Sequence, residues 1–333
     1  HEWEMHFIQS DSKSALSYNW SLWYILIVGL MFSGLLGAML LIISANTENA
    51  RRSYVRGQSE TALYIIPVMV GMLTFAIAGL TYVQMAQEEK SLVLKSLTDE
   101  LDSVKKAVNN TVRYTIIAQR RMALRWQSRN GIPENEWNSE ALNLLNDTQA
   151  LTTLQWVDKD FNVRWVQPLE GNENIIGLDV TFNGERRSLI DEAMTPDTIT
   201  MTPPIKLVQG YKAIICYIPL YPNQSFDGFI TGIYDLDLFF KNSLSAETRE
   251  MFNIEISDGK AVVYTQTGED AARHEGMAIQ SDIVFFNRIW TVRVWPTSRF
   301  METQKSYLPL IILLGGMFMS VLIGFAIYYA MAA

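Results

Sequence analysis

The chain has few of the residues that metal centres and disulfide frameworks need. Its single cysteine, Cys216, excludes an intrachain disulfide. Cys216 lies in the apolar run AIICYIPLY, where a cysteine is typically a small buried side chain. The three histidines, His1, His6 and His274, lie far apart, and neither HExxH nor CxxC occurs. We therefore predict no metal site.

Sequence motifs for nucleotide and acyl chemistry are also missing. There is no G-x-S-x-G turn, no G-x-x-x-x-G-K-[ST] phosphate loop and no glycine-rich fingerprint after a strand. We predict no catalytic residue and no cofactor, and we expect any kinase or cyclic-di-GMP activity in a cytoplasmic domain outside these residues. The net charge of −8, without a stripe of Lys and Arg, argues against a nucleic-acid partner.

Charge is scarce, and the apolar residues are gathered into long runs. Only 19% of the residues are charged and 49% are hydrophobic. Three runs without any charged residue cover residues 22–44, 62–83 and 307–331. About 20 apolar residues suffice for a helix to cross a bilayer. The sequence therefore predicts three transmembrane helices in contact with membrane lipid.

The loop between the first two runs sets the orientation. Residues 45–61 contain Arg51, Arg52 and Arg56, and short loops rich in arginine stay in the cytoplasm. This loop is therefore predicted to be cytoplasmic. Residues 84–306 then form a large extracytoplasmic domain.

The two ends of the chain resemble each other. HEWEMHF at residues 1–7 aligns with RIWTVRV at residues 288–294, so that Trp3 matches Trp290. In the same register, GLMFSGLLG at residues 29–37 falls on GMFMSVLIG at residues 316–324. A duplicated module explains both matches. We interpret residues 1–14 as the end of a preceding extracytoplasmic domain and residues 22–44 as its exit helix.

Small residues recur at four-residue spacing in the first and third runs. They are Gly29, Ser33 and Gly37, then Gly316, Ser320 and Gly324. Such spacing lets two helices approach closely. The alternative is a smooth groove that faces lipid, and we favour helix packing because the spacing recurs.

The extracytoplasmic domain is predicted to begin with a long helix. Leu94, Leu97, Leu101, Val104 and Val108 are spaced by three and four residues. This seam indicates either a dimer contact or packing on the helix's own domain, so a homodimer or a larger membrane complex is expected. The helix should end near Gly131 and Pro133, and a second should cover residues 136–146.

Short β-branched and aromatic runs follow, separated by DKD, GN, NQ and DG turns. They cover residues 151–158, 161–169, 205–221, 227–236, 252–259, 260–266, 282–286 and 288–295, with a helix at 185–194. A long N-terminal helix followed by an antiparallel sheet is typical of an α+β domain.

The order of these segments resembles a known family. The segments that carry the resemblance are, in order, RMALRW, P-x-x-x-W, LQWVDKDFNVRWVQP, IIGLDV, a helix, IKLVQGYKAIICYIPLY and GFITGIYDL. The chain resembles the CHASE-type periplasmic sensor domains of bacterial membrane receptors. The resemblance covers residues 84–331 and implies a PAS-like fold in the bacterial inner membrane. Members of the family usually signal to a histidine kinase, a diguanylate cyclase or a phosphodiesterase.

A PAS-like sheet binds small molecules between the sheet and its covering helices. The candidate ligand-binding residues are Arg125, Trp126, Trp156, Trp165, Gln209, Tyr217, Tyr234 and Asp235. Structural alternatives exist: Trp156 and Trp165 can be core, Asp235 can end a strand, and Arg125 can pair with Asp158 or lie in solvent. The leading hypothesis is a transmembrane signal receptor for an unknown small ligand or partner. The alternative is a structural or accessory subunit of a larger membrane complex.

Overall fold

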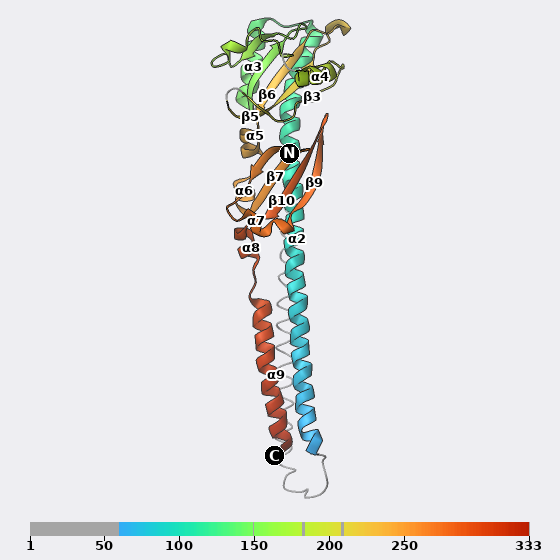
Figure 1. Ribbon diagram of the computed structural model, residues 1–333, viewed down its shortest axis with the longest axis vertical. Helices are drawn as coiled ribbons and strands as arrows, with labels where there is room; N and C mark the ends of the chain where they lie inside the picture. Colours follow the sequence, from blue (N-terminus) through green and yellow to red (C-terminus); the bar gives the residue numbers. More distant parts are fainter. Residues whose placement is uncertain (1–59, 149, 182–183, 208–209, 333) are drawn as a thin grey trace, which may run out of the picture. The chain divides into compact units, whose positions relative to one another are not determined.

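The computed structural model describes residues 60–148, 150–181, 184–207 and 210–332 (Figure 1). The expectations for residues 1–14, for the span at 22–44 and for the stripe of Gly29, Ser33 and Gly37 fall outside the described residues. The described chain divides into two compact units. Residues 60–88 and 306–332 belong to one, and Glu89–Lys305 forms the other, called here the 89–305 unit.

Two of the described helices are long and apolar enough to cross a membrane. They are α2 (Glu60–Arg129) and α9 (Leu308–Ala332). The predicted spans at 62–83 and 307–331 lie on these two helices. The third predicted span, at 22–44, is outside the described residues.

The 89–305 unit contains a six-stranded antiparallel sheet in the order β2-β1-β6-β5-β3, with β4 also paired to β5. Its strands are β1 (Leu151–Val157), β2 (Val163–Gln167), β3 (Thr200–Met201), β4 (Ile205–Lys206), β5 (Lys212–Pro219) and β6 (Phe229–Asp235). The run expected as one strand at 205–221 is interrupted at Gly210, where φ is +97°. The short strand β3 was not predicted.

A second, four-stranded antiparallel sheet has the order β8-β7-β10-β9. Its strands are β7 (Phe252–Asp258), β8 (Ala261–Gln266), β9 (Ile279–Phe285) and β10 (Arg288–Pro296). The expected antiparallel sheet is thus present as two sheets. The chain leaves the first sheet through α5 (Leu236–Ser243) and α6 (Ala246–Met251). Neither helix was predicted; they lie between the strands expected at 227–236 and 252–259.

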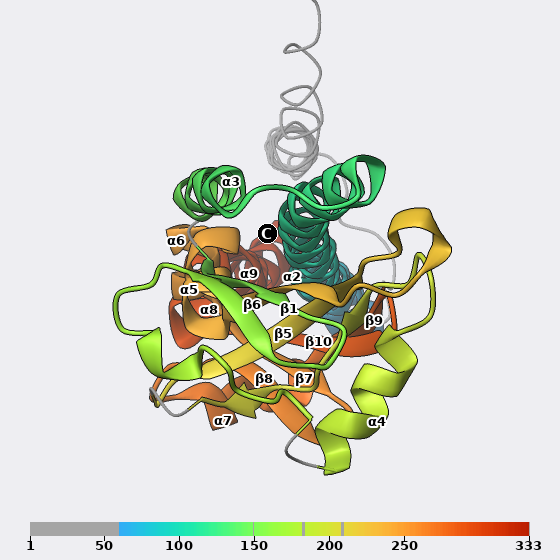
Figure 2. The ribbon, with the colours of Figure 1, turned by 90° about the horizontal axis from the view of Figure 1, so that it is seen from above.

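Helices cover both faces of the six-stranded sheet (Figure 2). α2 and α3 (Glu134–Asp147) lie on one face, and α4 (Gly184–Ala193) lies on the other. The remaining short helices are η1 (Glu173–Ile175), η2 (Pro222–Gln224), α7 (Ala271–His274), η3 (Glu275–Met277) and α8 (Ser298–Gln304). The α+β domain therefore has core layers on both sides of this sheet.

The heptad-like seam of α2 packs inside its own domain. Leu97, Leu101, Val104 and Val108 are all buried in the main core, whereas Leu94 is half exposed. Burial of these four side chains accounts for the spacing without a second copy. The seam therefore stabilises the domain that it belongs to.

Candidate functional site

A row of polar side chains crosses the face of the six-stranded sheet that α4 covers. Thr200 of β3 pairs with Tyr217 of β5, Tyr217 pairs with Thr231 of β6, and Thr231 pairs with Gln155 of β1. Directly opposed residues of an antiparallel sheet point to the same face. These four residues, called here the polar row, are all buried.

Two hydroxyls of the polar row lack partners. Within the described residues, the Oγ1 atoms of Thr200 and Thr231 are buried without a hydrogen bond. Nearby Thr202 differs, because its Oγ1 accepts a hydrogen bond of 2.9 Å from the N–H of Ile215. A buried hydroxyl without a partner lowers stability, so its presence calls for an explanation. A ligand that supplies the missing partner is one.

Tyr217 occupies the centre of the polar row. Burial raises the pKa of its hydroxyl to about 12, and the Arg186 guanidinium on α4 lowers this pKa in part. The hydroxyl is therefore neutral at physiological pH and can donate or accept a hydrogen bond. The Tyr217 ring also packs edge-on against Phe229, with 5.5 Å between ring centroids.

Apolar side chains surround the polar row. α4 contributes Ile190 and Ala193, and the sheet contributes Val157, Val163, Ala213, Ile215, Phe229 and Ile233. Ligand sites for small molecules are mostly apolar, with a few polar groups that fix orientation. This face of the sheet has that composition.

Three predicted site residues lie on the opposite face of the sheet. They pack with Trp137 of α3 into one cluster, in which adjacent ring centroids are 4.5–5.7 Å apart. The three are Trp126 of α2, Trp156 of β1 and Trp165 of β2. The indole N–H of Trp126 donates a hydrogen bond of 2.8 Å to Asp227. This packing agrees with the alternative reading of Trp156 and Trp165 as core.

Tyr234 lies on that same face and takes part in a buried link to α2. Its hydroxyl donates a hydrogen bond of 2.7 Å to Oε1 of Gln119. The Nε2 of Gln119 donates to the carbonyls of Cys216 at 3.3 Å and Ile230 at 3.1 Å. Burial raises the pKa of Tyr234 well above its usual value. Gln119 was missed, although it is a polar residue in the apolar stripe of α2.

The other candidate residues have local partners. Arg125 pairs with Glu140 of α3 at 2.7 Å, and Asp158 pairs with Arg164. Asp235 caps the N-terminus of α5 by accepting a hydrogen bond of 3.0 Å from the N–H of Leu238. Gln209 is outside the described residues. Of the predicted ligand set, the described structure places Tyr217 on the α4 face.

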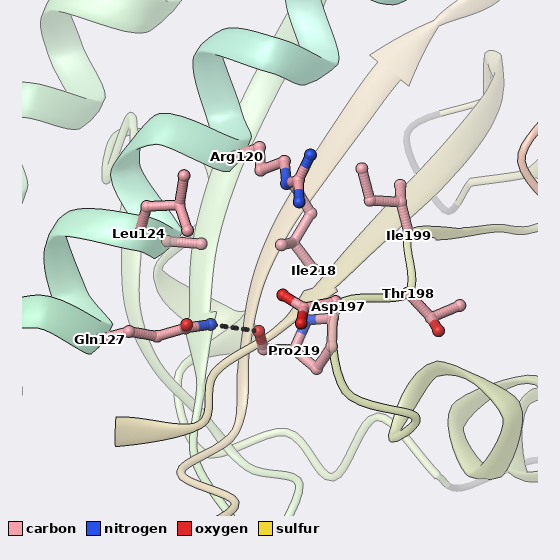
Figure 3. Close-up of a pocket in the computed structure, with 9 residues that line it drawn as sticks. Arg120, Leu124, Gln127, Asp197, Thr198, Ile199, Ile218 and Pro219 are labelled. Carbon is pink, nitrogen blue, oxygen red and sulfur yellow. Dashed lines mark hydrogen bonds between the residues drawn. The ribbon is translucent and has the colours of Figure 1, made fainter. Parts of the chain in front are cut away.

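A small cavity lies between α2 and the segment that precedes β3 (Figure 3). Its volume is about 10 Å³, and Arg120, Leu124 and Gln127 line it on the α2 side, with Asp197, Thr198 and Ile199 opposite. Gln127 donates a hydrogen bond of 3.2 Å to the carbonyl of Pro219. A cavity of this size holds about one water molecule. It is too small for a ligand.

In the other unit, the stripe of small residues on α9 lies against α2. The Ser320 hydroxyl donates a hydrogen bond of 2.9 Å to the carbonyl of Gly71. A Cβ atom added at Gly316 would lie 2.3 Å from the Cβ of Ala78, and one added at Gly324 would lie 3.6 Å from the carbonyl of Pro67. Larger residues at Gly316 would therefore force the two helices apart.

Comparison with solved structures gives distant likenesses. An extracellular ligand-binding receptor from Desulfohalobium retbaense is 13% identical, with a TM-score of 0.50 over 61% of this chain and 40% of that one. The ligand-binding domain of the amino acid chemoreceptor PctB from Pseudomonas aeruginosa, in complex with L-Arg, is 13% identical, with a TM-score of 0.49 over 65% of this chain and 100% of that one. The periplasmic sensory domain of the Campylobacter jejuni chemoreceptor Tlp1 is 10% identical, with a TM-score of 0.43 over 65% and 98%. The first of these likenesses shows the fold. This chain spans less than half of that receptor's length.

The comparison with curated proteins finds no match. Residues 113–272 match the family model described as the CHASE domain. The match runs from the last quarter of α2 through the six-stranded sheet and the first two strands of the second sheet. It is shorter than the 84–331 range of the sequence resemblance. Over residues 113–272 the chain is therefore similar to the CHASE domain, in agreement with the predicted resemblance to CHASE-type sensor domains.

Proposed function

We propose that this chain binds a small molecule at the polar row and relays binding to a cytoplasmic output domain, such as a histidine kinase, a diguanylate cyclase or a phosphodiesterase. The observation that carries the proposal is the pair of buried, unpartnered hydroxyls on Thr200 and Thr231, on either side of Tyr217. A ligand with hydroxyl, carbonyl or amine groups along one edge would satisfy them.

Two features of the polar row limit the size of the ligand and the way in which it can enter. The polar row crosses four strands, so three steps of about 4.8 Å make it about 14 Å long. α4 covers the row through Ile190 and Ala193, which are fully buried. Ligand entry therefore requires α4 to move away from the sheet, and this movement is the conformational change that the receptor would sense.

The relay uses the two helices that lead to the membrane. α2 continues without a break from Glu60 to Arg129, and α9 begins twelve residues after the end of β10 at Pro296. The proposed receptor is multi-pass in the bacterial inner membrane, with residues 84–306 periplasmic and residues 45–61 cytoplasmic. We further propose that it works as a homodimer or in a larger membrane complex. The accessory-subunit alternative gains no support from the CHASE match.

A ligand screen tests the site. The 333-residue chain in nanodiscs would be titrated with amino acids, carboxylic acids, nucleobases and sugars, and thermal unfolding would be followed by tryptophan fluorescence. Thr231→Val removes the unpartnered hydroxyl, so the free protein should gain about 1 kcal/mol of stability. The same variant should bind the identified compound about tenfold more weakly, because one hydrogen bond to the ligand is lost.

Thr115→Val is the matched control. Thr115 is equally buried, but its hydroxyl donates to the Thr111 carbonyl of its own helix at 2.8 Å. This variant should leave the affinity unchanged. Equal affinities of the Thr231→Val variant and the unmodified chain would contradict a site at the polar row.

Labelling with a membrane-impermeant thiol reagent tests the orientation. The native Cys216 is fully buried, and burial raises the pKa of its thiol, so it should react little. In intact cells, a cysteine at Asn172 should be labelled and one at Asn49 should not, because Arg51, Arg52 and Arg56 keep their loop in the cytoplasm. The reverse pattern would invert the proposed topology.

A further inference from the structure

The turn between β9 and β10 contacts the edge of the other sheet through one side chain. Oδ1 of Asn287 accepts a hydrogen bond of 2.9 Å from the N–H of Met201, and Nδ2 of Asn287 donates one of 3.2 Å to the Met201 carbonyl. The amide thus pairs with both backbone groups of one residue, as the next strand of a sheet would. Edge strands expose such backbone groups. Here Asn287 satisfies them.

Met201 belongs to β3, which is only two residues long. β5 pairs with β3 on one side, and Asn287 binds it on the other. Met201 is fully buried, and the preceding residue, Thr200, is the end of the polar row. A displacement of Thr200 must therefore also move the backbone that Asn287 holds.

The turn that carries Asn287 has an unfavourable backbone. Phe286 has a φ of +46°, and it is followed directly by Asn287 in a two-residue connection between Phe285 and Arg288. Such turns usually place glycine where φ is positive, because a bulky residue is strained there. Strained residues persist where the surrounding structure holds them, often at switch regions. The Phe286 side chain is nearly half exposed, so its burial does not account for the strain.

β10 carries any movement of this turn into the core of the second sheet. Trp290, Val292 and Val294 of β10 are buried there. At the end of the strand, Thr297 caps α8 by accepting a hydrogen bond of 3.2 Å from the N–H of Phe300. A shift at Asn287 is therefore passed along β10 towards α8.

We propose that Asn287 couples the two sheets, so that a ligand engaging Thr200 on β3 displaces β10. The signalling role rests on the proposed ligand site. The mechanical coupling between the two sheets does not depend on that site, and it can be measured without a ligand. A second hydrogen bond between the sheets, from Nζ of Lys212 to the Val262 carbonyl, is longer, at 3.5 Å, and exposed. It supplies the matched control.

The test is hydrogen exchange of the ligand-free 333-residue chain in nanodiscs. Thr231→Val perturbs the six-stranded sheet, and its effect is read at the amides of β10. With Asn287 present, the stabilised sheet should slow exchange in β5, β6 and also β10, by about tenfold in each if they open together. In the Asn287→Ala background, the slowing should stay within β5 and β6. In the Lys212→Met background, it should still reach β10.

A second perturbation keeps the test decisive if Thr231→Val does not slow exchange in β5 and β6. Gln119→Leu removes the bonds from α2 to β5 and β6, so it should speed exchange there and, through Asn287, in β10. Equal propagation to β10 with and without Asn287 would overturn the coupling. A failed ligand screen beside Asn287-dependent propagation would instead count against the proposed ligand site and leave the coupling standing.

Discussion

Replacing Gly228 with alanine is expected to lower the free energy of unfolding by about 4 kcal/mol, because the new side chain has no room and the backbone suits only glycine. Gly228 lies just before β6 with a φ of +106°. A Cβ atom there would lie 2.0 Å from the Val157 carbonyl oxygen and 2.8 Å from the carbonyl carbon of Asp158. Both are backbone atoms, so no side-chain rotation can relieve the clash. β1 and β6 would have to separate.

Gly171→Ala separates the effect of backbone strain from the effect of the steric clash. Gly171 also has a positive φ, +80°, but nothing lies within 4 Å of its added Cβ atom. Only backbone strain remains there, so we expect a loss of about 1 kcal/mol. Thermal unfolding of the chain in nanodiscs should then show a fall in melting temperature of about 10 °C for Gly228→Ala and a few degrees for Gly171→Ala. Similar shifts for both variants would show that close packing at Gly228 does not matter.

Only some elements of the fold follow from local sequence patterns. The apolar run at 307–331 specifies a helix by its length and composition, and the seam from Leu97 to Val108 does so by residue spacing. The division into two sheets does not follow in this way, because strand pairing is set by contacts between distant segments. The residues of α5 include Phe239 and Phe240, and such apolar residues directly after β6 are typical of a strand and of a short buried helix alike.

The candidate site was predictable only in part, for a similar reason. Trp156 and Trp165 are conspicuous in sequence, but the face that a strand residue occupies depends on register and on which helix covers that face. The structure places them against α2 and α3. Thr200 and Thr231 are inconspicuous in sequence. They matter because register puts them beside Tyr217 under α4, without hydrogen-bond partners.

Gln119 gave a clearer signal in the sequence, since it is a polar residue in the apolar stripe of α2. The structure buries it fully. Its side chain accepts from Tyr234 and donates to two carbonyls of the sheet. A Cβ atom added at Gly232 would lie 2.6 Å from its Oε1 atom, so a larger residue there would displace the Gln119 side chain. Gln119 therefore fixes α2 to the centre of the sheet.

Gln119→Glu is expected to make stability depend on pH. A protonated glutamic acid can accept from Tyr234 and donate to one carbonyl, so near pH 4 the variant should lose only about 1 kcal/mol. An ionised carboxylate is disfavoured by burial and by the two carbonyls, which raises the folded-state pKa above the unfolded value of about 4.3. The penalty is therefore absent below the unfolded pKa and grows as pH rises, by about 1.4 kcal/mol per pH unit. At pH 7 it should reach about 4 kcal/mol.

Gln119→Leu supplies the control, because leucine removes the same hydrogen bonds without adding a titratable group. It leaves the Tyr234 hydroxyl without its partner, so we expect a loss of about 3 kcal/mol that does not change between pH 4.5 and pH 7.5. Unfolding of both variants and of the unmodified chain would be followed by the fluorescence of the tryptophans packed beside β1 and β2, and differences at each pH cancel the other titrating groups. The Glu variant should be the more stable of the two at pH 4.5 and the less stable of the two at pH 7.5. Parallel pH profiles for the two variants would mean that the side chain at position 119 reaches solvent, and that the link between α2 and the sheet is not sealed from water.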